Sequence, residues 1–191
     1  MALLDPTGDE SATEQQPLAP RLDSLDGARI GLFDNGKLTA EPVLDVVEDR
    51  LSAAYPEATF DRYALGKNRV NKAKDADELA RVTEWATGLD AGIGAYGDCG
   101  SCTKFLAWGV DAIEAADTPA VGLIDEGFEL DYQSNAIERG RPLRYAKLPV
   151  RSETPELDRV RDQLTDEAVA AIEAELTRPL SADERAEPVT Q

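Results

Sequence analysis

Two cysteines, Cys99 and Cys102, are the only thiols in the 191-residue chain, and two residues separate them. They lie in the glycine-containing stretch GAYGDCGSCTKF, residues 94–105. A thiol two residues from another can attack a bond formed by the first and release it as an intramolecular disulfide. If a helix begins here, its N-terminus lowers the pKa of a nearby thiol below the usual value of about 8.5. The spacing therefore indicates a thiol redox site.

The surrounding sequence alternates between strand-like and helix-like patterns and predicts a single α/β domain. Apolar runs predict strands over 28–36, 58–66, 89–97, 118–125 and 141–150, and helical periodicity predicts helices over 39–56, 75–88, 102–117, 129–140 and 156–176. Thr39 is the expected cap of the first helix. The alternation favours a three-layer sandwich with a mainly parallel sheet, flavodoxin-like or Rossmann-like, ending in one long amphipathic helix. We expect an extended arm over 1–27, the domain over 28–178 and a flexible tail over 179–191.

In such a sheet, ligands bind beyond the carboxyl ends of the strands. The cysteine stretch follows the third strand, and polar side chains follow the first strand, so we expect them on one rim. The predicted substrate-binding residues are Asp34, Asn35, Lys37, Gly97, Asp98, Gly100, Ser101 and Thr103. Asp34–Gly36 is equally compatible with a plain turn. Asp125 and Glu126 follow the fourth strand, where helix capping and solvation are the favoured interpretation.

Other functions could use the same residues, but the sequence supports them less than a redox site. GIGAYG, residues 92–97, matches the G-x-G-x-x-G pattern of dinucleotide-binding proteins, but it follows the third strand instead of the first. A phosphate or carboxylate cradled by backbone N–H groups is a plausible alternative. A structural zinc ion needs four ligands, and the chain has two cysteines and no histidine. Without histidine, a histidine-based triad is impossible. We expect no metal and no cofactor.

The composition is strongly acidic: 38 acidic residues against 20 basic ones give a formal net charge of −18. Such a surface repels nucleic acid and anionic membranes, so neither is an expected partner. The acid is dispersed along the chain and lysine is scarce, which favours adaptation to high salt, where charge repulsion is screened. No segment has the pattern of a signal peptide or a membrane helix, so we expect a cytoplasmic protein with normally reduced cysteines.

Four motifs together resemble the UGSC family of (seleno)proteins, which is named for a Sec-Gly-Ser-Cys motif. They are LLDPTG, LAPR, SLDGARIGLFDNGK and GDCGSCT, in this order, and the resemblance covers roughly residues 3–125. It places Cys99 at the position where some members carry selenocysteine, followed by Gly100, Ser101 and the partner thiol Cys102. Exchange of selenium for sulfur at one position implies that this atom does chemistry.

These observations predict a thiol-dependent redox enzyme in which Cys99 attacks as a thiolate and Cys102 resolves the adduct. The alternative is a non-redox protein that uses the same glycine loop for covalent chemistry or for binding a small anion. A binding module in which the cysteines only shape the loop is the third hypothesis. The expected partner is a small-molecule or thiol substrate, with an unknown electron donor and a possible homo-oligomer.

Overall fold

The computed structural model describes residues 15–186, and its centre is a five-stranded parallel sheet. The strands are β1 (Arg29–Asp34), β2 (Thr59–Ala64), β3 (Ala91–Gly97), β4 (Ala120–Asp125) and β5 (Arg144–Leu148). They lie in the order β2-β1-β3-β4-β5, and every neighbouring pair is parallel. This is the flavodoxin-like strand order, with its switch point between β1 and β3. The predicted fold class is confirmed.

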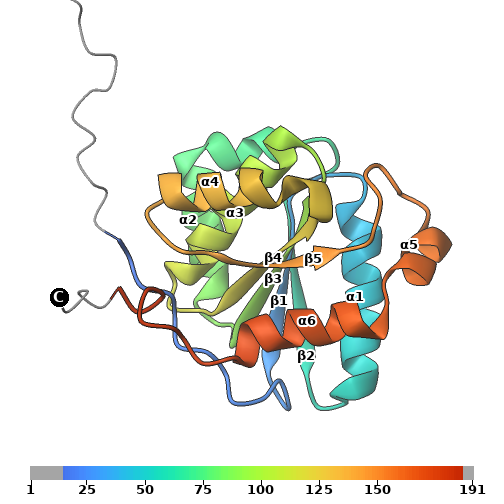
Figure 1. Ribbon diagram of the computed structural model, residues 1–191, viewed down its shortest axis with the longest axis horizontal. Coiled ribbons are helices and arrows are strands. Elements are labelled where there is room, and N and C mark those ends of the chain that lie inside the picture. Colours follow the sequence, from blue (N-terminus) through green and yellow to red (C-terminus); the bar gives the residue numbers. More distant parts are fainter. Residues whose placement is uncertain (1–14, 187–191) are drawn as a thin grey trace, which may run out of the picture.

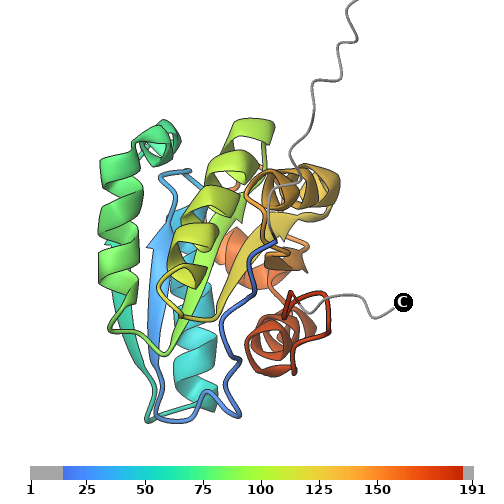
Figure 2. The same ribbon diagram turned by 90° about the vertical axis from the view of Figure 1, so that its left-hand side faces the viewer.

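Helices cover both faces of the sheet, so β1, β3 and β4 are almost entirely buried, as their apolar runs indicate. On one face lie α1 (Ala40–Ala54), α5 (Leu157–Gln163) and α6 (Asp166–Thr177). On the other lie α2 (Ala76–Ala86), α3 (Gly100–Glu114) and α4 (Glu129–Glu138), as Figures 1 and 2 show. Two short 3₁₀ turns, η1 (Val70–Lys74) and η2 (Glu126–Phe128), follow β2 and β4. Among residues 15–186, no helix combines the length and the apolar character that a membrane span needs.

The glycines of GIGAYG lie within β3 and let α3 approach the sheet closely. A Cβ on Gly92 would stand 2.8 Å from Ile113 Cγ2, and one on Gly94 would stand 2.9 Å from Leu106 Cδ1. Because β3 extends through Gly97, only Asp98 and Cys99 separate the strand from the helix. The predicted strand over 89–97 is thus confirmed, the predicted glycine loop is shorter than expected, and helix packing accounts for the glycines that resembled a dinucleotide motif.

The single C-terminal helix predicted over 156–176 is also wrong, because the structure divides this segment into α5 and α6. Leu164 and Thr165 between them have extended backbone, and the Thr165 hydroxyl accepts a hydrogen bond from the N–H of Ala168 at 3.2 Å. This side-chain cap starts a new helix at Asp166. The break turns α6 back onto the sheet beside β5, where Ile172 and Leu176 are buried.

Buried ion pairs attach both terminal segments to the domain. Arg21 donates to Glu114 at the end of α3 at 2.8 Å, and both side chains are almost fully buried. Arg144 at the start of β5 donates to both carboxylate oxygens of Glu184, at 2.7 and 2.9 Å. Burial raises the pKa of Glu114, whereas at Glu184 the hydrogen bonds from Arg144 and Ser181 outweigh the effect of burial and lower the pKa to about 2. Residues 1–14 and 187–191 of the predicted arm and tail, including the LLDPTG motif, lie outside the described residues.

Candidate functional site

The two cysteines form a disulfide at the N-terminus of α3. Their sulfur atoms are 2.08 Å apart and their Cα atoms 5.1 Å apart. Cys99 is the N-cap residue, and its sulfur accepts a hydrogen bond from the N–H of Cys102 at 3.2 Å. Cys99 is half-buried, while Cys102 is 3% exposed. The sulfur of Cys99 is therefore the one more open to a reagent from solvent.

Asn35 joins the end of β1 to both the end of β3 and the first turn of α3. Its side-chain N–H₂ donates to the carbonyl oxygens of Tyr96 at 3.1 Å and Cys102 at 3.2 Å. Its side-chain oxygen accepts from the N–H groups of Tyr96 and Lys37, each at 3.1 Å. With no exposed surface, Asn35 uses all of its hydrogen-bonding capacity inside the protein. It thus sets the position of the cysteine turn instead of facing solvent.

The carboxylate of Asp98 lies beside the disulfide, within 4.8 Å of both sulfur atoms. Its Oδ2 accepts from the Thr39 hydroxyl at 3.1 Å and from the N–H of Glu153 at 3.0 Å. Its Oδ1 is buried, has no hydrogen-bond partner among residues 15–186, and lies 3.5 Å from Lys37 Nζ. Thr39 occupies the N-cap position of α1 but makes no capping hydrogen bond, because its hydroxyl is used here. Thr39 therefore holds the predicted N-cap position, but the capping hydrogen bond expected from its side chain is not formed.

The remaining rim residues divide by exposure. Gly100 and Ser101 are exposed on the first turn of α3, and Lys37 is half-buried between Asp98 and Glu153. Gly97 and Thr103 are fully buried against each other, since a Cβ on Gly97 would stand 3.0 Å from Thr103 Oγ1. Whether these residues bind a substrate stays a prediction.

The acidic side chains at the strand ends stabilise turns. Asp34 accepts from the N–H of Gly36 at 2.7 Å, and burial raises the pKa of Asp34. Asp125 accepts from the N–H of Gly127 at 2.9 Å and caps η2. Asp125 also lines a hollow of about 230 Å³ with Glu126 and Arg151 at the ends of β4 and β5. These contacts agree with the turn interpretation of Asp34 and the capping interpretation of Asp125.

Three contributors to the site were missed from the sequence. Ser152 and Glu153 come from the loop after β5, and the Ser152 hydroxyl donates to the backbone oxygen of Asp98 at 2.9 Å. More than 50 residues separate them from Asp98, so only tertiary structure reveals the contact. The third is the basic segment 66–74, GKNRVNKAK, whose lysines and arginine are visible in the sequence as a local reversal of charge.

The site lies at the switch point between β1 and β3, where ligands bind in folds of this type. There, a half-exposed sulfur at a helix N-terminus and a buried partner sulfur can be cleaved and re-formed. Cys99, Cys102 and Asp98 are also three potential metal ligands, one fewer than a closed zinc site requires.

The sequence model of the UGSC family matches residues 2–178, most of the chain and well beyond the motifs that first suggested it. No curated protein and no solved structure matches the chain.

Proposed function

The chain belongs to the UGSC family, and we propose that it is a thiol–disulfide oxidoreductase. Cys99 attacks a disulfide of the substrate as a thiolate, and Cys102 then attacks the mixed disulfide. The substrate leaves as two thiols, having gained two electrons, and the protein keeps them as the Cys99–Cys102 disulfide. A thiol reductant returns the protein to the dithiol form.

One observation carries this proposal: the two sulfur atoms are within bonding distance at the start of a 15-residue helix, with Cys99 the more accessible. The N–H of Cys102 already points at the sulfur of Cys99, and the same contact stabilises a thiolate there. In a redox mechanism Cys102 is the resolving thiol that forms the disulfide, whereas in a non-redox covalent mechanism it would have no function.

Asp98 supplies a proton acceptor for the second step. Cys102 is buried, so bulk water does not reach its thiol readily. The carboxylate of Asp98 lies within 4.8 Å of the Cys102 sulfur, and its Oδ1 atom, which has no hydrogen bond from any residue that the structure describes, is free to accept one from the Cys102 thiol. Lys37 balances the charge of Asp98 at 3.5 Å, which reduces the repulsion between that carboxylate and a thiolate at Cys99.

The test is to mix fully reduced protein with bis(2-hydroxyethyl) disulfide, count the thiols released and weigh the intact chain. The wild type should release two thiols per chain and lose the mass of two hydrogens. The C102S variant should release one thiol and retain a stable adduct on Cys99, and C99S should react at least about tenfold more slowly than C102S. The matched control is S52A, which removes an exposed hydroxyl from α1, away from the cysteines, and should behave as the wild type.

If C99S reacts as fast as C102S, the assignment of nucleophile and resolving thiol is wrong. If the reduced wild type forms neither an adduct nor a disulfide, the redox function itself is wrong.

A further inference from the structure

Most of the basic residues of this acidic protein form ion pairs, but a few that lie close together in the sequence do not. Fourteen of its 20 lysines and arginines form ion pairs with carboxylates of the described residues. Arg69, Lys72 and Lys74 form none with residues 15–186, although the chain holds nearly twice as many acids as bases. All three lie in segment 66–74, which contains four basic residues and no acidic one. An anion could therefore bind these side chains without displacing a carboxylate of the described structure.

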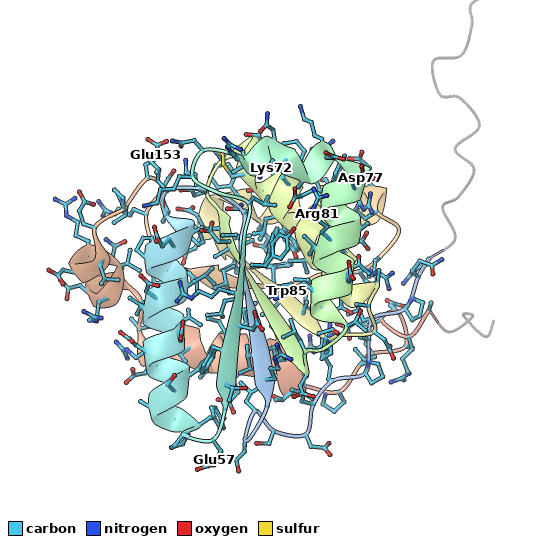
Figure 3. All side chains as sticks on the ribbon, turned by 180° about the vertical axis from the view of Figure 1, so that it is seen from behind. Glu57, Lys72, Asp77, Arg81, Trp85 and Glu153 are labelled. Carbon is cyan, nitrogen blue, oxygen red and sulfur yellow. A yellow bond between two sulfur atoms is a disulfide. The ribbon has the colours of Figure 1, made fainter. Side chains whose placement is uncertain are left out.

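Segment 66–74 packs against α3 and against the turn after β1, two elements that also position the cysteine turn. The N–H of Asn68 donates to the backbone oxygen of Gly36 at 2.7 Å, and Gly36 is next to Asn35, which holds the Cys102 carbonyl. Lys74 Nζ lies 5.5 Å from the ring centroid of Phe105, which follows Cys102 by one turn of α3. Figure 3 shows Lys72 and Glu153 at the same end of the molecule, with Glu57 at the opposite end.

Other features of this edge also favour an anion. The N–H groups of Gly100 and Ser101 belong to the first turn of α3 and have no carbonyl partner within the helix. Arg151, in the loop that covers Asp98, likewise forms no ion pair with residues 15–186. Two carboxylates of this edge already face cations, Glu41 paired with Lys67 and Glu153 with Lys37, and Asp75 accepts a hydrogen bond as the cap of α2. Asp34 is half-buried and accepts from Gly36.

From this arrangement we infer that the cysteine pair acts on a small anionic disulfide, one bearing carboxylate or phosphate groups, that Arg69, Lys72 and Lys74 hold beside Cys99. The inference rests on the proposed redox function and adds the class of substrate to it. The Cys99 thiolate forms a bond to one substrate sulfur and releases the other half as an anionic thiolate. Cys102 then displaces the second half, so one substrate disulfide is reduced to two thiols while the protein dithiol is oxidised.

The experiment compares the reduced protein with three aliphatic disulfides of similar size: dithiodipropionate, bis(2-hydroxyethyl) disulfide and cystamine, which are anionic, neutral and cationic. Second-order rate constants are measured at one KCl concentration by quenching and mass spectrometry. The same probes are reacted with a peptide of sequence GDCGSCT, and each protein rate is divided by the peptide rate, which removes the intrinsic reactivity of each probe.

We expect the wild type to favour the anionic over the neutral probe by roughly tenfold after this correction, and to disfavour the cationic probe. The R69Q/K72Q variant should lose most of this preference, because its rate with the anionic probe falls far more than its rate with the neutral one. The control variant R29Q/R159Q also loses two positive charges, one at the start of β1 and one in α5. It should keep the preference for the anionic probe.

Equal corrected rates for all three probes, or equal losses in R69Q/K72Q and R29Q/R159Q, would overturn the anionic substrate and leave the redox function standing. Failure of the wild type to react with any of the probes would overturn the redox function instead.

Discussion

Asp98 and Glu184 are both buried carboxylates, but their surroundings give them different roles. Both oxygens of Glu184 are bonded to Arg144, and one also accepts from the N–H of Ser181 at 2.7 Å. Asp98 has one oxygen to which no described residue donates a hydrogen bond, and its carboxylate lies within 4.8 Å of two sulfur atoms. A fully paired carboxylate stabilises the fold, whereas one with a free acceptor near a thiol remains available for proton transfer.

The Glu184 pair should make stability depend on pH. Hydrogen bonds from Arg144 and Ser181, opposed by burial, lower the pKa of Glu184 from 4.5 to about 2, so the folded state holds the charged form more strongly than the unfolded chain does. This stabilisation is fully present above the unfolded pKa and is lost as the pH falls from 4.5 towards 2. We expect E184Q to lower the free energy of unfolding by about 2 kcal/mol at pH 7, as measured with urea.

The loss in E184Q should shrink as the pH falls from 4.5 towards 2, because the wild type then loses the same charge. D183N is the matched control, since Asp183 is exposed and in no ion pair with the described residues, and it should change stability by less than about 0.5 kcal/mol. An E184Q penalty that is the same at pH 2.5 and pH 7 would contradict the assigned pKa.

At the scale of the elements, the contact between α3 and the sheet depends on glycine. A Cβ on Gly109 would stand 2.2 Å from Cε1 of Phe33, a fully buried ring on β1. In an exposed helix interior, replacing glycine by alanine stabilises by about 1 kcal/mol. Here we expect G109A to destabilise the protein by about 2 kcal/mol instead, because the helix or the ring must move. Urea unfolding of the oxidised protein measures the change.

Gly100 provides the comparison within the same helix. A Cβ there would meet nothing within 4 Å, so G100A should leave the free energy of unfolding unchanged to within about 0.5 kcal/mol. If G109A is as stable as the wild type, the close approach of α3 to β1 is not a constraint on the fold.

Much of the fold followed from sequence periodicity, because the buried parallel strands are apolar runs and the helices repeat every three or four residues. The start of α3 was misplaced at Cys102, since Gly100 and Ser101 have weak helical preference and the helix begins there only when Cys99 caps it. The break at Leu164 was missed because the apolar pattern continues across it, and only the Thr165 cap marks it.

The candidate site was predictable in part. The cysteine spacing and the ends of β1 and β3 indicated which residues would meet, and the disulfide and Asn35 agree with that. The surroundings of Asp98 were not predictable, because Thr39 and Glu153 reach it from α1 and from the loop after β5. Contacts between segments so distant in the chain leave no local pattern.

At the scale of the whole molecule, the net charge of −18 should make the fold sensitive to salt. Carboxylates dispersed over the surface repel one another when unscreened, and the Debye length falls from about 30 Å at 0.01 M salt to about 3 Å at 1 M. We expect Tm to rise by roughly 5–10 °C between dilute buffer and molar KCl, as measured by calorimetry.

The control is the same titration near pH 4.3, the sequence pI, where net repulsion vanishes and the rise in Tm should be much smaller. A Tm that does not change with KCl at neutral pH would count against adaptation to high salt.

The attachment of the two terminal segments has a topological consequence. The N–H of Leu18 donates to the backbone oxygen of Glu184 at 2.8 Å, and Gln15 donates to the backbone oxygen of Asp183. The first and last described residues thus lie side by side, as the blue and red ends in Figure 1 show. The described chain is almost a closed ring, so the domain is suited to circular permutation. A short linker between positions 15 and 186, with new ends in the exposed turn at Glu57, would leave every strand and the cysteine turn intact.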